Sequence, residues 1–186
     1  MAVSAIDQEL GRHFREYISA VRQAWSGQDV PGLAASVRQH MIRLLQSTPR
    51  DESWIAGLLA DKPAGRELYR DADHGFIQMG HFHRAGHHNA PHDHGPCWVV
   101  YGVYEGEVEI ATYRRTDDGS VAGKAFLEVA GSRLLKPGIA YEYLSGEIHS
   151  TRCLSDGAIV MRFLSADLEK VSRGRYNLEA GTVTAI

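Results

Sequence analysis

The feature that most constrains the fold is a change of hydrophobic period near residue 60. Before it, apolar side chains recur every three or four positions, which is typical of amphipathic helices. Residues 67–164 lose that period and alternate short apolar, β-branched segments with turns rich in Gly, Asp and Pro. The sequence therefore predicts an all-β core, a β-barrel or jelly roll, with amino-terminal α-helices packed on its outside.

The expected elements can be bounded from their caps and turns. One helix is expected over residues 5–26, a second begins after Asp29 with Pro31 in its first turn, and a third is short, at 51–59. Strands are expected at residues 76–82, 98–104, 108–114, 125–129, 133–136, 140–144 and 158–164, with turns at 117–120, 130–132 and 155–157. We expect one domain over 1–186, divided into a helical part (1–65), a barrel (66–170) and a tail (171–186) that either covers the barrel or frays.

Composition excludes several classes of partner. A chain of 186 residues with 44% hydrophobic content is long enough for one well-buried domain. Its net charge of -3 provides no concentrated basic face, so we expect binding to neither nucleic acid nor a membrane. The first residues lack the features of a secretion signal, which predicts a cytoplasmic protein. Two cysteines, Cys97 and Cys153, are too few for a disulfide framework.

The candidate chemistry lies in the histidines. Six of the ten fall in the stretch 81–94. His92 and His94 are two residues apart, so on extended backbone both imidazoles leave on the same face and can bind one ion. His149, on a distant strand, is expected to supply the third ligand, which is how small β-barrels hold a metal. His81 also shares a strand face with His83, and we expect this pair either to support the site or to pack.

These residues resemble the two metal-binding motifs of the cupin superfamily, whose fold is a double-stranded β-helix. The motif residues are His92, His94, Gly106, Gly131, Pro137 and His149. Within that superfamily the chain is most similar to the cysteine dioxygenase (thiol dioxygenase) family. Tyr69 and Arg70 precede a strand, His92-Asp93-His94 matches the family's His-Asp-His, and residues 140–149 resemble its segment leading to the third histidine. The resemblance covers about residues 10–170.

The resemblance implies a mononuclear non-haem iron dioxygenase. Fe(II) would be bound by His92, His94 and His149, and a small thiol such as cysteine or 3-mercaptopropionate would be oxidised by O2 to a sulfinate. Common cupins add a glutamate shortly after the second histidine, where this chain has Trp98 and Val99. The thiol dioxygenases likewise use three imidazoles. Imidazole also suits Zn, Ni, Mn and Cu, so the metal is not fixed by the ligands.

The chain departs from the family pattern at two places. The family's cysteine–tyrosine crosslink would join positions held here by Val99 and Leu164, so no crosslink is expected. Arg162 replaces the histidine of the family's Ser-His-Tyr arrangement. A substrate carboxylate would then be held by Arg70 or Arg162. The alternatives are ion pairs, and their carboxylate partners are Asp71 or Asp73 for Arg70 and Glu142 or Glu147 for Arg162.

Two other classes of function stay open. One is a different cupin reaction on another small organic acid or a diketone. The other is a non-catalytic metal-binding or sensing cupin, in which His81 is a fourth ligand and closes the site. Tyr101, Tyr141 and Tyr143 are expected mainly to pack in the core, with a hydroxyl near bound oxygen as the alternative. Pairing of two barrels into a homodimer through strand edges or flat faces is also open.

Overall fold

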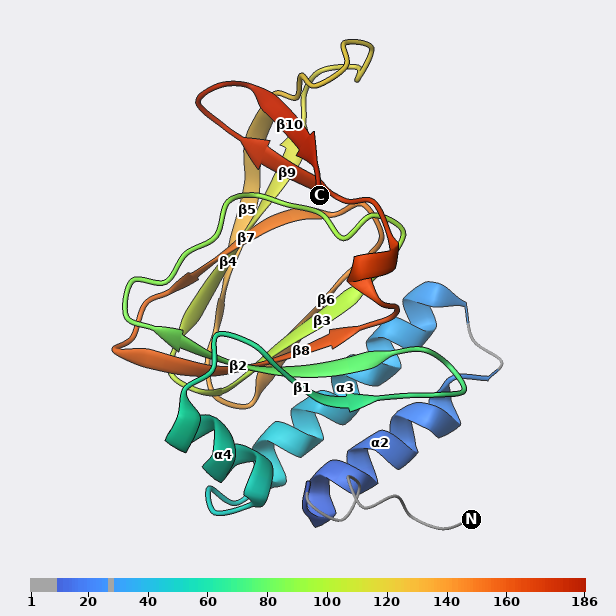
Figure 1. Cartoon of the computed structure of the whole chain (residues 1–186), viewed down its shortest axis with the longest axis vertical. Helices are drawn as coiled ribbons and strands as arrows, with labels where there is room; N and C mark the ends of the chain where they lie inside the picture. Colours follow the sequence, from blue (N-terminus) through green and yellow to red (C-terminus); the bar gives the residue numbers. More distant parts are fainter. Residues whose placement is uncertain (1–9, 27–28) are drawn as a thin grey trace.

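The computed structural model describes residues 10–26 and 29–186 and contains two facing β-sheets with helices on one side (Figure 1). The larger sheet has the strand order β1-β2-β8-β3-β6 and the smaller has the order β5-β4-β7. The strands are β1 (Arg66–Arg70), β2 (Ile77–Arg84), β3 (Val99–Glu105), β4 (Val108–Arg115), β5 (Leu127–Leu135), β6 (Ile139–Tyr143), β7 (Ile148–Cys153) and β8 (Gly157–Leu164). This confirms the predicted all-β core, a jelly-roll barrel with helices packed outside.

Three described helices cover the outer face of the five-stranded sheet (Figure 1). They are α2 (Arg12–Ala24), α3 (Val30–Ser47) and α4 (Ser53–Asp61). The start of α3 is as predicted, because the Asp29 side chain accepts a 2.9 Å hydrogen bond from the Gly32 amide. α2 begins after Gly11, and the earlier residues of the predicted first helix lie outside the described residues. No helix in the described part is long and apolar enough to cross a membrane.

Alternation along β8 separates two cores. Ile159, Met161 and Phe163 pack with the helices. The residues between them face the other way, and Val160 and Leu164 belong to a second core that also contains side chains of the smaller sheet. β3 follows the same rule, with Val100 toward the helices and Val99, Tyr101 and Val103 toward the barrel interior. Interior positions of the large sheet can therefore be identified by their parity.

One predicted turn is wrong. Residues 130–132 do not separate two strands, because β5 runs without interruption from Leu127 to Leu135. Gly131 pairs with Thr112 of β4, and the register shifts between Thr112 and Tyr113. A glycine inside a strand often marks such a bulge rather than a turn, since the chain bends there without leaving the ladder.

The carboxyl-terminal tail covers one end of the barrel. After a short 3-10 helix (Leu168–Lys170) it forms a hairpin of β9 (Gly174–Asn177) and β10 (Thr182–Ala185), which lies near β4, β5 and β7 in Figure 1. The Tyr176 amide donates to the Pro91 carbonyl at 2.8 Å, and the Asp93 amide donates to the Gly174 carbonyl at 3.0 Å. The tail is thus bonded directly to the segment that carries the first two predicted ligands.

Candidate metal centre

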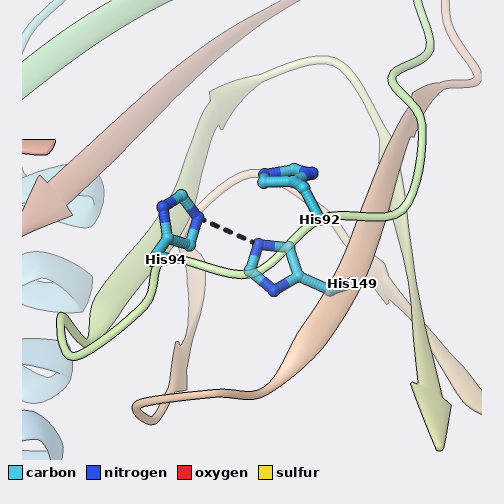
Figure 2. Close-up of side chains that lie close together, drawn as sticks. All are labelled: His92, His94 and His149. Carbon is cyan, nitrogen blue, oxygen red and sulfur yellow. Dashed lines mark hydrogen bonds between the residues drawn. The ribbon is translucent and has the colours of Figure 1, made fainter. Parts of the chain in front are cut away.

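The structure brings His92, His94 and His149 together. One ligand atom of each side chain lies within 4.8 Å of those of the other two, and the three rings converge in Figure 2. His92 and His94 come from the segment between β2 and β3, and His149 comes from β7. The backbones of His92 and His149 are joined by two reciprocal N–H to C=O bonds of 2.9 Å each. The first and third ligands are therefore fixed to each other through the main chain.

Backbone carbonyls set the tautomers of two of the rings. Nδ1 of His92 lies 3.0 Å from the Ala90 carbonyl, and Nδ1 of His149 lies 3.1 Å from the Glu147 carbonyl. A carbonyl can only accept, so each Nδ1 carries the proton and each Nε2 keeps its lone pair for a ligand. Nε2 of His149 faces Nε2 of His94 at 3.3 Å.

Burial makes all three imidazoles neutral. It is the largest cause that lowers their pKa values, bringing the pKa of His149 to about 3 and moving those of His92 and His94 below the ordinary range. The charge of Arg162 lowers all three pKa values further, and neighbouring imidazoles also lower those of His94 and His149. Three converging neutral imidazoles without a carboxylate are a donor set that fits a divalent transition metal. Within residues 10–26 and 29–186, no other group of three or more His, Cys, Asp or Glu side chains converges in this way.

Tyr101 adds a hydroxyl to this centre. Its oxygen lies 3.3 Å from Nε2 of His94 and 3.5 Å from Nε2 of His149. Tyr143 also contacts the centre through its ring, whose centroid is 4.7 Å from that of His149. The Tyr143 hydroxyl is buried and has no hydrogen-bond partner among the described residues. Sequence reasoning named both tyrosines but favoured packing, although alternation along the strand from Val99 already placed Tyr101 inside.

The Asp93 side chain fixes the backbone of the segment that carries His92 and His94. Its carboxylate accepts hydrogen bonds from the Gly95 amide at 2.7 Å, the Gly174 amide at 3.1 Å and the Tyr176 hydroxyl at 2.7 Å. These bonds hold the backbone between the two ligands of the His-x-His pair and connect it to the tail. This role was not predictable from the sequence, because two of the three partners, Gly174 and Tyr176, lie about eighty residues away in the chain.

Arg162 lies on the interior face of the large sheet. Its position on β8 is opposite Met79 of β2 and Tyr101 of β3. Its Nε is buried without a partner, and no carboxylate among the described residues lies within ion-pair distance. The two predicted ion-pair partners are engaged elsewhere.

Those partners are Glu142 and Glu147. Glu142 forms an ion pair of 3.2 Å with Arg38 of α3, on the helix side of the sheet. Glu147 accepts a hydrogen bond from the Leu144 amide. Because Glu142 and Arg162 leave opposite faces of the sheet, the alternative in which they form an ion pair is not realised.

Arg70 is placed in a surface cluster of charges. Its guanidinium lies 2.7 Å from Glu67 and 2.7 Å from Asp167, and its side chain is 44% exposed. The predicted partners Asp71 and Asp73 pair with Arg22 instead. Among the described residues, Arg70 has no contact with the three histidines, so the structure does not bring it into the centre.

His81 lies on the interior face but outside the group of three. Its Nδ1 is 2.6 Å from the Ala64 carbonyl, and its Nε2 is buried without a partner in the described chain. Burial, followed by the charge of Arg162, lowers its pKa to about 3. The pKa of His83 is lowered to about 4, again mainly by burial. His81 is therefore a neutral imidazole beside Arg162 rather than part of the converging set.

Val99 and Leu164 are directly opposite each other on β3 and β8. These are the two positions at which the family resemblance places the crosslinked cysteine and tyrosine. Both side chains are buried and apolar. The expected absence of a crosslink follows from the residue types.

A large open cleft lies on a different face of the molecule. It has a volume of about 1160 Å³ and lies between the outer side of β4 and β7 and the β9-β10 hairpin. Outward residues such as Tyr113, Ser150 and Arg152 line it. The three histidines do not line this cleft.

Comparison with solved structures finds cupin-fold proteins. DMSP lyase DddQ from Ruegeria pomeroyi DSS-3 matches with a TM-score of 0.47 and 19% identity over 70% of this chain and 73% of that one. KdgF from Halomonas sp. matches at 0.43 and 15% over 57% and 82%. Oxalate oxidase in complex with glycolate matches at 0.39 and 19%, over 50% of this chain and only 42% of the oxidase. No family model and no curated protein matches the sequence.

Proposed function

We propose that the protein is a mononuclear non-haem iron dioxygenase that oxidises a small thiol bearing a carboxylate, such as cysteine or 3-mercaptopropionate, to a sulfinate. The observation that carries this proposal is the juxtaposition of three neutral imidazoles with an interior cation, Arg162, that has no carboxylate partner among the described residues. Neutral ligands leave the full charge of a bound ion available to anions. Arg162 adds a planar fork that matches a carboxylate.

The substrate would be oriented at both ends. Its carboxylate would bind the guanidinium of Arg162, and its sulfur would face His92, His94 and His149. A bound iron ion would lower the thiol pKa and supply the redox chemistry for dioxygen. Both atoms of O2 end on sulfur, so that thiolate and O2 together give the sulfinate with no other reactant.

Buried apolar side chains would keep water away from the bound substrate. The interior side chains around the centre are buried and include Val99, Val103, Val160 and Leu164. A dry wall strengthens the attraction between the Arg162 cation and a carboxylate, because there is little water to screen it. Neutral His81 adds no competing charge to that wall.

Oxygen consumption by protein reloaded with Fe(II) under anaerobic conditions tests the proposal. The substrates are cysteine, 3-mercaptopropionate and cysteamine, and a His149→Ala variant is the control. We expect one O2 consumed per thiol with a carboxylate-bearing substrate, together with loss of uptake in the variant. If no thiol promotes uptake while iron is demonstrably bound, the proposal is wrong, and another organic acid or a sensing role takes its place.

A further inference from the structure

The Tyr101 hydroxyl contacts two candidate ligand nitrogens, which packing of its ring in the core does not require. Its oxygen and the two Nε2 atoms of His94 and His149 form a triangle with sides of 3.3, 3.3 and 3.5 Å. Two ligands of one tetrahedral ion, with bonds of about 2.1 Å, lie about 3.4 Å apart. The distance from the hydroxyl oxygen to each nitrogen is therefore close to the distance expected between two ligand atoms of one ion.

The surrounding contacts leave this oxygen free for such a role. Its only hydrogen-bond partners among the described residues are the two ring nitrogens, whose lone pairs a metal would use. Tyr143 provides an internal comparison. Its ring lies against His149 as closely as that of Tyr101, with centroid distances of 4.7 and 5.4 Å, yet its hydroxyl makes no contact with either nitrogen.

We propose that the Tyr101 phenolic oxygen is a fourth protein ligand of the metal, giving a three-histidine, one-tyrosine centre. Coordination as phenolate would release the phenol proton to solvent. A tetrahedral ion would be closed by these four ligands, whereas an ion that expands to six-coordination would still have two positions for small molecules. The inference rests on the metal centre of the proposed function but is independent of dioxygenase activity. It also replaces His81 as the source of a fourth ligand.

Visible spectroscopy of the protein loaded with Cu(II) or Fe(III) tests the ligand directly. A coordinated phenolate produces a charge-transfer band in the visible range. The variants are Tyr101→Phe and, as a matched control, Tyr143→Phe, which removes a neighbouring buried phenol of the same size. Binding of Co(II) to all three proteins is measured by calorimetry, and circular dichroism checks that each variant is folded.

We expect the band in the wild type and in Tyr143→Phe but not in Tyr101→Phe, whose Co(II) affinity should fall about tenfold or more. Absence of the band from the wild-type protein overturns the inference without any variant, because the phenol then only packs. Persistence of the band in Tyr101→Phe overturns it as well. Thiol oxidation without a band defeats this inference alone, whereas a band without thiol oxidation defeats only the proposed function.

Discussion

Tyr101 and Arg162 are directly opposite each other on β3 and β8, and both positions face the barrel interior. The phenol contacts the nitrogens of two candidate metal ligands, while the guanidinium beside it has no carboxylate partner in the described chain. A hydroxyl that contacts the candidate metal ligands and a guanidinium without a carboxylate partner in the described chain therefore lie on two neighbouring strands. In the proposed function, the guanidinium would bind the anionic end of a short substrate while the other end faces the three histidines.

Replacing Arg162 should lower activity toward thiols that carry a carboxylate but not toward thiols that lack one. Arg162→Gln removes the cation, so kcat/KM for 3-mercaptopropionate should fall about 10- to 100-fold, the value of one or two charge-assisted hydrogen bonds. Cysteamine lacks a carboxylate and serves as the internal control. Arg162→Lys should restore part of the loss, because it keeps the charge without the fork. Equal losses for both thiols would show that Arg162 does not recognise the carboxylate.

Metal binding should stabilise the folded state. An ion that binds only the folded chain raises the free energy of unfolding by about 2.7 kcal/mol when its free concentration is a hundred times Kd. We expect Ni(II) or Fe(II) to raise the melting temperature and a chelator to reverse the change. His149→Ala should abolish the increase, since a ligand is lost. A melting temperature that does not respond to any of these metals would contradict the assignment of the centre.

The Asp93 carboxylate should matter for both stability and metal affinity. Asp93→Ala leaves the Gly95 and Gly174 amides and the Tyr176 hydroxyl without their acceptor. We expect a loss of about 2–3 kcal/mol in chemical denaturation. Tyr176→Phe removes only one of the three bonds and should cost about 1 kcal/mol. If both variants lose the same amount, the two backbone contacts of Asp93 contribute nothing.

Acid should destabilise the protein in part through His81. Its pKa is about 3 in the folded state because of burial, whereas an unfolded histidine titrates near 6.5. Below pH 6.5 the unfolded chain binds the proton and the folded chain does not, so stability is present above that pH and is lost as pH falls toward 3. Between pH 7 and 5 this one group should lower the free energy of unfolding by about 2 kcal/mol.

Urea denaturation at the two pH values measures the effect of His81. A His81→Asn variant keeps a short amide that can still donate to the Ala64 carbonyl but cannot titrate. Its stability should therefore depend less on pH than that of the wild type, with the difference equal to the contribution of His81. Identical pH dependence in the two proteins would mean that His81 also titrates normally when folded.

The sequence predicted what depends on local spacing. The change of period gave the helices and the barrel, Asp29 with Pro31 gave the start of α3, and the two-residue spacing of His92 and His94 gave two converging rings. Long-range register was not predictable. The strand positions of Tyr101 and Arg162 suggested inward-facing side chains, but nothing in the spacing showed that they would be neighbours across two strands sixty residues apart in the chain.

The same limit explains the errors. The ion-pair alternatives for Arg70 and Arg162 named Asp71, Asp73, Glu142 and Glu147, whereas the folded chain pairs Arg70 with Glu67 and Asp167 and leaves Arg162 without a carboxylate among the described residues. Gly131 was interpreted as a turn because a glycine has the same local propensity in a bulge. In each case the outcome depended on which distant strand supplied the neighbour.

The alternation along β8 determines which of its positions can be substituted without disturbing the packing of the helices. The helices pack against Ile159, Met161 and Phe163. Arg162 lies between two of these residues in the chain but faces the barrel interior. Under the proposed function, we expect an exchange at an inward position to change which molecule is accepted and to leave the helix packing intact. A laboratory selection restricted to Arg162 and Met79, which are opposite each other on β8 and β2, should therefore yield folded proteins with new substrate preferences at a much higher rate than one directed at Ile159, Met161 and Phe163.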